Sequence, residues 1–226
     1  MDWATAIFPF ENRIEPTRFV RRIWRTHSVP EAAMISVAVP TWQMVFVQKS
    51  SGAQSIFVRG PDTAATTVEI PRDAKFLGIQ FELGVFMPSL PLAGLTDNAL
   101  SVPILSDRTC ALLGDVVEIP SFDTADVFVN RLVRAGLLLR DVTVEQVLLR
   151  QPVALTDRSI QRRFVTATGL TYSAIRQMAR ADRAVDLLHR GVPIVDVVDR
   201  EGFSDQAHLT RSLKKFLGKT PRAIAR

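Results

Sequence analysis

The sequence predicts an α+β protein with a β-rich barrel or sandwich at its N-terminus, a helical linker, and an all-helical C-terminal domain. Three observations lead to this prediction. Prolines interrupt the first hundred residues at intervals of about ten, a spacing typical of short strands joined by turns. Apolar residues take up helical spacing from about Asp107. Beyond residue 143 every apolar stripe has the period of a helix. We therefore expect a β-rich sensor or interaction domain in residues 1–105, a linker in 106–141 and a helical domain in 142–226.

The bulk composition is that of a globular protein. The chain has 226 residues, enough for one large or two smaller cores, and 47% of them are hydrophobic. No apolar run approaches the length of a membrane span, and residues 1–4 do not begin a secretion signal. A single cysteine, Cys110, excludes an intrachain disulfide and a cysteine-based zinc site. These features predict a cytoplasmic protein with no membrane partner.

The N-terminal strands follow from short apolar runs bounded by turn residues. A polar turn around Gly52 separates the first two runs, which predicts a hairpin. In the last run Ile79, Phe81 and Leu83 alternate with polar residues, as in a half-buried strand. The four runs span residues 42–47, 55–59, 65–70 and 76–83.

The same region has little of the chemistry that an enzyme needs. It contains one histidine, His27, and no cluster of metal-ligating residues, nucleophile elbow or phosphate-binding glycine loop. We expect no catalytic residue, no metal and no cofactor. A small-molecule pocket remains an alternative role for aromatic residues that we otherwise assign to the core. These are Trp24, Trp42, Phe46, Phe57 and Phe81.

The linker is predicted to form two helices, residues 107–119 and 123–139. The second has Asp123 and Asp126 in its first turn and Arg131 and Arg134 towards its end, an order that suits the helix dipole. We expect this pair to pack between the domains and to contribute to contact between two copies of the chain.

The C-terminal domain contains an internal repeat. The stretch Gly202–Pro221 predicts a glycine turn, a helix with Ser204 as its N-cap, and a stop at Gly218. A matching stretch lies 49 residues earlier, where Thr156 is the predicted N-cap. Two helix-turn-helix motifs are therefore expected, with reading helices at about 157–168 and 205–217. A long helix over 171–190 joins them, and a 20-residue helix spans about 30 Å, close to the ~34 Å between successive major-groove faces.

Charge is distributed unevenly along the chain. Residues 1–140 hold 13 basic and 14 acidic side chains, whereas residues 141–226 hold 15 basic and 9 acidic ones. A surplus of positive charge confined to the helical part predicts that this part meets a polyanion.

Residues 144–226 resemble the DNA-binding domain of the AraC/XylS family of bacterial transcription regulators. The resemblance is carried by Ile160–Phe164, Gly169–Thr171, Arg183–Ala184 with Leu187–Leu188, Ile194–Val198 and the whole of Gly202–Pro221. It implies a sequence-specific regulator with double-stranded DNA as partner and a cupin-like N-terminal domain. It also implies a small-molecule effector, a homodimer, and RNA polymerase as a partner if the chain is an activator.

The resemblance implies DNA contacts from the outward faces of the two reading helices. Arginine can pair with guanine, glutamine with adenine, and threonine or histidine with a base or a phosphate. The implied readers are Arg158, Gln161 and Arg162 in the first motif and Gln206, His208, Thr210 and Arg211 in the second. Phosphate contacts, which position the protein on DNA without specifying a sequence, are implied for Arg163, Lys214, Lys215 and Lys219.

The chain departs from the family pattern at several positions. Leu209 and Leu213 stand where aromatic residues are common, and Ala207 is too short for a base hydrogen bond. Pro152 follows the leading helix of the first motif, where a glycine turn is usual, so we expect that motif to dock differently. Two alternative functions stay open: a cupin-type enzyme with an accessory DNA-binding domain, and a non-specific architectural DNA binder.

Overall fold

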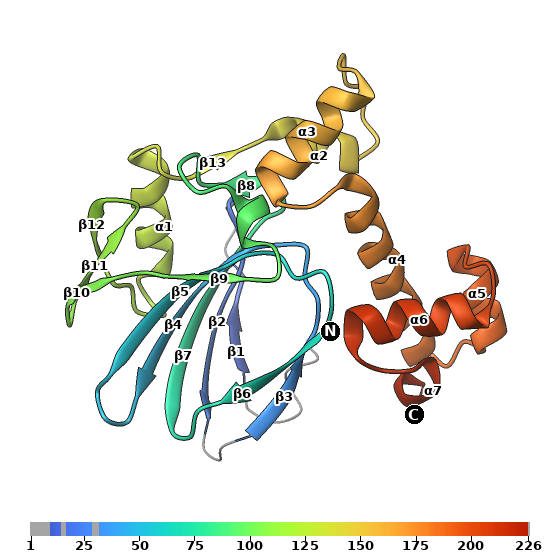
Figure 1. The fold of residues 1–226 in the computed structure, drawn as a ribbon, viewed down its shortest axis with the longest axis horizontal. Coiled ribbons are helices and arrows are strands. Elements are labelled where there is room, and N and C mark those ends of the chain that lie inside the picture. Colours follow the sequence, from blue (N-terminus) through green and yellow to red (C-terminus); the bar gives the residue numbers. More distant parts are fainter. Residues whose placement is uncertain (1–9, 15–16, 29–31, 226) are drawn as a thin grey trace.

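The computed structural model describes residues 10–14, 17–28 and 32–225. Strands occupy the N-terminal half and helices the C-terminal half, as Figure 1 shows. The predicted α+β class, with its β-rich and all-helical parts, is confirmed. Within the described residues, no helix is long and apolar enough to cross a membrane.

A six-stranded antiparallel sheet organises the N-terminal half, and its four inner strands contribute apolar residues to the core. The predicted hairpin is confirmed, with Phe46 opposite Ile56 in the register. In sheet order the strands are β1 (Phe10–Arg13), β2 (Val20–Ser28), β7 (Ala74–Phe81), β4 (Gln43–Lys49), β5 (Gln54–Arg59) and β9 (Ala99–Ser101).

Smaller sheets surround this one. β3 (Ala32–Ser36) pairs with β6 (Thr66–Ile70), and β8 (Val85–Phe86) pairs with β13 (Leu139–Arg140). A three-stranded sheet follows β9, formed by β10 (Ile104–Ser106), β11 (Thr109–Leu112) and β12 (Asp115–Glu118). A short 3₁₀ helix, η2 (Leu92–Leu95), precedes β9.

The first core lies between one face of the six-stranded sheet and α1 (Ala125–Arg134). It joins alternate strand residues such as Ile23, Phe46 and Ile79 to Phe128 and Leu132 of the helix. Trp42 and Phe81 are fully buried and stack with ring centroids 3.9 Å apart. Burial of such large side chains is the main stabilising contribution of this half.

The linker prediction is wrong for residues 107–119, which form β11 and β12 instead of a helix. Cys110 and Leu112 are buried and alternate with Thr109 and Ala111, which is the period of a strand. Gly114, with φ of 96°, makes the turn between the two strands. Only the second linker helix is present, as α1, and it ends at Arg134 rather than at residue 139.

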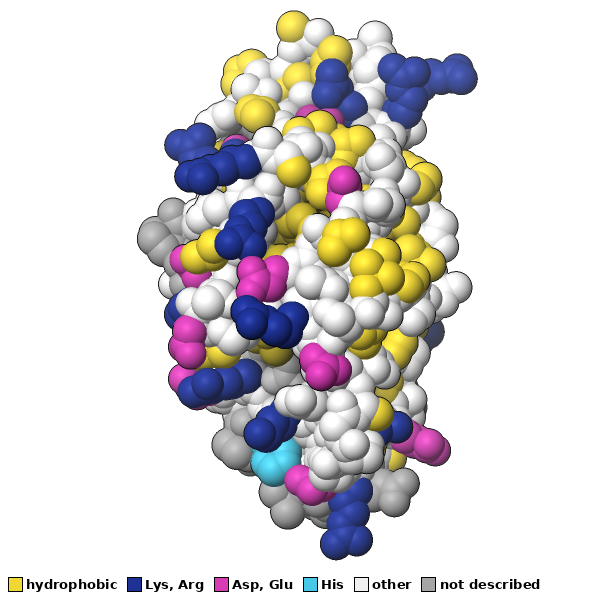
Figure 2. Space-filling view, turned by 90° about the vertical axis from the view of Figure 1, so that its left-hand side faces the viewer, with side chains coloured by type: hydrophobic (Ala, Val, Ile, Leu, Met, Phe, Trp, Pro, Cys, Tyr) yellow, Lys and Arg dark blue, Asp and Glu magenta, His cyan; other side chains and the backbone are white. Residues whose placement is uncertain are grey.

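Figure 2 shows the side of the molecule that carries α1 and the β10–β12 sheet. Positive and negative side chains alternate along it, with apolar side chains beside them. Leu105, Val116 and Val127 are exposed apolar residues of these elements.

Helices form the C-terminal half, around a second core. The helices are α2 (Val142–Leu148), α3 (Asp157–Thr168), α4 (Tyr172–His189), α5 (Ile194–Glu201), α6 (Gln206–Leu217) and α7 (Pro221–Ile224). Phe164 and Leu213, one from each reading helix, are fully buried in this core. Val37, Leu83 and Phe86 of the N-terminal half also pack against it, so the two halves are in contact.

Candidate DNA-binding surface

The first reading helix is α3, and its ends are set by local sequence. The Thr156 hydroxyl accepts the N–H of Ser159 at 3.3 Å, so the predicted N-cap is confirmed. Gly169 ends the helix in the left-handed conformation, with φ of 76°. Phe164 and Ala167 turn one face into the core and leave the opposite face to solvent.

The second reading helix is α6, where Asp205 is the N-cap instead of Ser204. The Asp205 carboxylate accepts the N–H of His208 at 2.6 Å. This hydrogen bond, assisted by the charge of Arg211, holds the pKa of Asp205 below its ordinary value. A carboxylate satisfies the same orphan N–H as a hydroxyl would and interacts better with the helix dipole, which is why the cap lies one residue further on.

The two reading helices repeat in register. α3 covers 157–168 and α6 covers 206–217, so both have 12 residues and the offset of 49 holds at each end. Each ends at a left-handed glycine, Gly169 or Gly218. The internal repeat predicted from sequence is therefore present in three dimensions.

Most of the implied DNA-contacting residues lie on exposed faces of these helices. Arg158, Gln161 and Arg162 project from α3 and border a hollow of about 790 Å³. On α6 the exposed residues are Gln206, Arg211, Lys214 and Lys215. Each motif thus presents both amide and cationic side chains to solvent.

Three of the other implied contacts are already engaged within the chain. Arg163 forms an ion pair of 2.9 Å with Asp141, the N-cap of α2. The Thr210 hydroxyl donates to the carbonyl of Gln206 at 2.8 Å. His208 lies 3.1 Å from the Ser204 hydroxyl and packs edge-on to the Phe203 ring. These side chains support the reading helices.

The turns of the two motifs differ in length, and the position of Pro152 in the sequence predicts a difference between the motifs. Residues 202–205 separate α5 from α6, whereas residues 149–156 separate α2 from α3. Pro152 lies in this longer connection and outside both helices. Arg150, with φ of 56°, adopts the left-handed conformation that Gly202 provides in the second motif.

Two arginines of α4 support the second motif, and the sequence analysis assigned neither a role. Arg180 donates to the carbonyl of Gly202 at 3.2 Å and lies over the Phe203 ring, 4.6 Å from its centroid. Arg183 forms an ion pair of 2.8 Å with Glu201. Both therefore fasten α4, the connecting helix, to the turn that precedes α6. Their spacing on α4 could have suggested one shared face, but their partners are fixed only by the fold.

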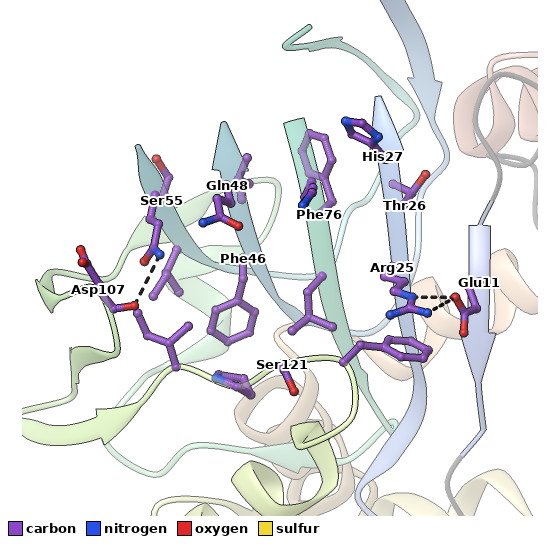
Figure 3. Close-up of a pocket in the computed structure, with 18 of the residues that line it drawn as sticks. Glu11, Arg25, Thr26, His27, Phe46, Gln48, Ser55, Phe76, Asp107 and Ser121 are labelled. Carbon is purple, nitrogen blue, oxygen red and sulfur yellow. Dashed lines mark hydrogen bonds and ion pairs between the residues drawn. The ribbon is translucent and has the colours of Figure 1, made fainter. Parts of the chain in front are cut away.

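Among the described residues of the N-terminal half, a cavity lies on each face of the six-stranded sheet. One, shown in Figure 3, has a volume of about 810 Å³ and has Phe46 at its floor. Arg25 spans its rim, bonded to Glu11 at 2.6 Å and lying over the Phe122 ring.

The second cavity, between the sheet and the β3–β6 pair, has a volume of about 440 Å³. Trp24, Val45 and Phe57 line it together with the buried Gln80. Of the five aromatic residues assigned to the core, Trp42, Phe46 and Phe81 are buried, while Trp24 and Phe57 are half-buried and face this cavity.

Comparison with known families and proteins finds matches to the helical part. Residues 151–226 match a family model described as a helix-turn-helix domain. The HTH-type transcriptional regulator RipA of Corynebacterium diphtheriae is 40% identical over 67 residues, which is 30% of this chain and 20% of that protein. The regulatory protein ada of Salmonella typhimurium is 33% identical over 84 residues, or 37% of this chain and 24% of that protein. The matched segments thus span about a fifth to a quarter of the length of these relatives.

Among solved structures, ToxT from Vibrio cholerae is similar at a TM-score of 0.41 and 8% sequence identity. The alignment covers 95% of this chain and 97% of that chain. A second ToxT structure aligns at a TM-score of 0.37.

Proposed function

We propose that residues 151–226, which match a helix-turn-helix domain, form an AraC-type DNA-binding domain, and that the chain is a sequence-specific DNA-binding transcription regulator. The observation that carries the proposal is the register of α3 and α6, two equivalent helices with exposed arginine and glutamine side chains. One such helix would read a single major-groove face. Two in one chain can read successive faces of the same duplex.

The length of the connecting helix supports this reading. α4 has 18 residues, which at 1.5 Å per residue corresponds to about 27 Å. Successive major-groove faces lie about 34 Å apart, a distance of the same order as this helix length. A single chain could therefore place both reading helices on one side of the DNA.

In vitro selection of DNA by the purified full chain tests the proposal, followed by footprinting on the selected site. We expect an enriched sequence and protection of two major-groove faces about one helical turn apart. Equal binding to all sequences would favour the architectural alternative. Protection of a single face would contradict the two-reader geometry.

We also propose that the cavity beside β3 and β6 is the effector site. Its walls are mostly apolar but include charged and amide side chains, among them Arg22, Arg59 and Gln80, so it suits a largely apolar small molecule that carries a polar group. Thermal-shift screening of small aromatic and aliphatic acids and alcohols tests this.

A cavity-filling variant gives that screen its control. Val68→Trp adds bulk to the cavity wall, whereas Thr67→Trp adds the same bulk at the neighbouring exposed position of β6. A stabilising compound should lose its effect with Val68→Trp and keep it with Thr67→Trp. Equal responses in both variants would place the compound elsewhere.

The remaining proposals concern location and assembly. A bacterial regulator works beside the chromosome, so we propose a cytoplasmic protein with no catalytic role. The exposed apolar residues Leu105, Val116 and Val127 support a second copy of the chain as partner. Sedimentation of the full chain at micromolar concentration would reveal such a dimer.

A further inference from the structure

The two reading helices share an unexpected feature, because the N-terminal half contacts both at their C-terminal ends. The last four carbonyls of a helix have no partner within it and need one elsewhere. In α6 the carbonyl of Lys215 accepts the N–H of Ala65 at 2.7 Å, and that of Phe216 accepts the N–H of Ala38 at 2.8 Å. The N-terminal half, called the sheet domain from here on, thus provides hydrogen-bond donors for two of the carbonyls that α6 itself leaves unpaired.

At α3 the equivalent end is held in a similar way. The Gly169 carbonyl accepts the hydroxyl of Thr96 at 3.0 Å. A Cβ added to Gly169 would lie 2.8 Å from the Leu92 carbonyl oxygen and 3.1 Å from Pro61 Cγ. The backbone of Leu92 therefore approaches Gly169 too closely for any side chain to fit there. A shift of the sheet domain would for this reason displace the end of α3.

One short loop reaches both helices. The loop of residues 60–65, between β5 and β6, contacts Gly169 through Pro61 and α6 through Ala65. Ala65 lies four positions after Pro61, so even a fully extended chain places these two residues at most about 14 Å apart. We name residues 60–65 the bridging loop. It leads into β6, which Figure 1 shows on the side of the sheet domain that faces α6.

The bridging loop is fixed along its length. The N–H of Asp62 donates to the Val39 carbonyl at 2.9 Å, and the Asp62 carboxylate forms an ion pair of 3.5 Å with Arg59. Asp62 is buried. Thr63 donates its N–H and its hydroxyl to the Asp97 carboxylate at 2.6 and 2.5 Å. A loop with this many partners can act as a rigid spacer.

We propose that the bridging loop holds the C-terminal ends of α3 and α6 at a fixed separation, and so makes the sheet domain a positioning element for DNA reading. The exposed readers Arg158, Gln161 and Arg211 lie away from these ends. The contact therefore leaves them accessible while limiting how α4 can bend. This inference rests on the proposed function, because it concerns the spacing of two DNA half-sites.

The prediction is a strict spacing preference in the full chain. One added base pair moves a half-site by about 3.4 Å along the duplex and rotates it by about a tenth of a turn. With rigidly held reading helices, that insertion should weaken binding about tenfold or more. Dissociation constants are measured on duplexes carrying the selected site with one base pair added or removed between its halves.

Gly169→Ala should disturb the contact, and Gly191→Ala is its matched control. Gly191 has φ of 77° against 76° for Gly169, but a Cβ there meets nothing within 4 Å. Both variants thus carry the same backbone strain, and only the first displaces the sheet domain. Thr96→Val, which removes the hydrogen bond to Gly169 at similar volume, covers the case in which Gly169→Ala fails to fold.

We expect the insertion penalty to fall at least threefold in Gly169→Ala or Thr96→Val and to stay unchanged in Gly191→Ala. An unchanged penalty in all three would overturn the inference and assign spacing to α4 alone. Tighter binding by Gly169→Ala at every spacing would also overturn it, because the contact would then be inhibitory. If the unaltered chain shows no sequence preference, the proposed function itself fails, and this inference with it.

Discussion

At the scale of single residues, ion pairing within the chain distinguishes the exposed arginines that are implied to contact DNA. Arg158, Arg162 and Arg211 have no ion pair within the described residues, whereas Arg163, which is also exposed, is paired with Asp141. Arg162 and Arg163 are both arginines of α3 for which the resemblance implies a DNA contact, to a base for Arg162 and to phosphate for Arg163. The partner across the motif distinguishes them.

Arg211→Ala tests the reading role directly. We expect a loss of about 1–3 kcal/mol on the selected site and weaker discrimination at one base position, because arginine pairs with both guanine acceptors. Arg72→Ala removes the same charge from an exposed position between β6 and β7 and should leave binding unchanged. If Arg211→Ala weakens binding equally on all sequences, Arg211 contacts phosphate only.

The cap at Asp205 gives a prediction about pH. The folded-state pKa of Asp205 is lowered, so its stabilisation is complete above the unfolded pKa of about 4 and is lost as the pH falls through the lower folded value. Asp205→Asn keeps an oxygen acceptor but cannot titrate. Urea unfolding of both proteins between pH 2.5 and 7 should therefore show a smaller acid-induced loss in the variant, and equal losses would contradict this role.

At the scale of elements, the two reading helices depend on the same buried positions. Leu213 of α6 is fully buried, and its apolar side chain packs in the helical core. The same is true of Phe164, its equivalent in α3. The two helices thus keep equivalent buried positions, although the turns that precede them differ in length.

Leu213→Ala should lower the free energy of unfolding by about 2–5 kcal/mol, because it leaves a cavity in the helical core. The matched control is Val195→Ala on α5, where the side chain is 65% exposed and the cost should stay within about 0.5 kcal/mol. Chemical denaturation followed by circular dichroism measures both. Similar costs for the two variants would mean that α6 is not anchored through Leu213.

At the scale of the whole molecule, the two halves differ in charge and are joined by direct contacts. The surplus of positive charge belongs to residues 141–226, while the sheet domain is nearly neutral. DNA affinity should therefore come from the helical part, while the sheet domain positions the two reading helices.

Binding should weaken steeply with salt, since each phosphate contact releases a counterion. Lys214→Ala should lower affinity on all sequences alike and reduce the slope of log K against log salt by about one. Titrations between 50 and 300 mM salt measure this slope. A slope near zero for the unaltered chain would contradict the electrostatic account of the helical domain.

The sequence by itself determined the helical domain well, because its signals are local. Caps, glycine stops and the apolar stripes of α3 and α6 act within a dozen residues, and the offset of 49 needs no tertiary information. The same local rules failed at residues 107–119, where short apolar runs suit a helix or a strand. There the pairing of β11 with β12 decided the outcome.

Only the tertiary structure decided what joins the halves. Nothing in the local sequence links Leu92 to Gly169, or Ala65 to Lys215, because these contacts are made by backbone groups far apart in the chain. Hydrogen bonds from backbone carry no residue signature, and a glycine that needs room looks the same as one that only ends a helix. The two reading helices were therefore predictable from sequence, while the element that holds them apart was not.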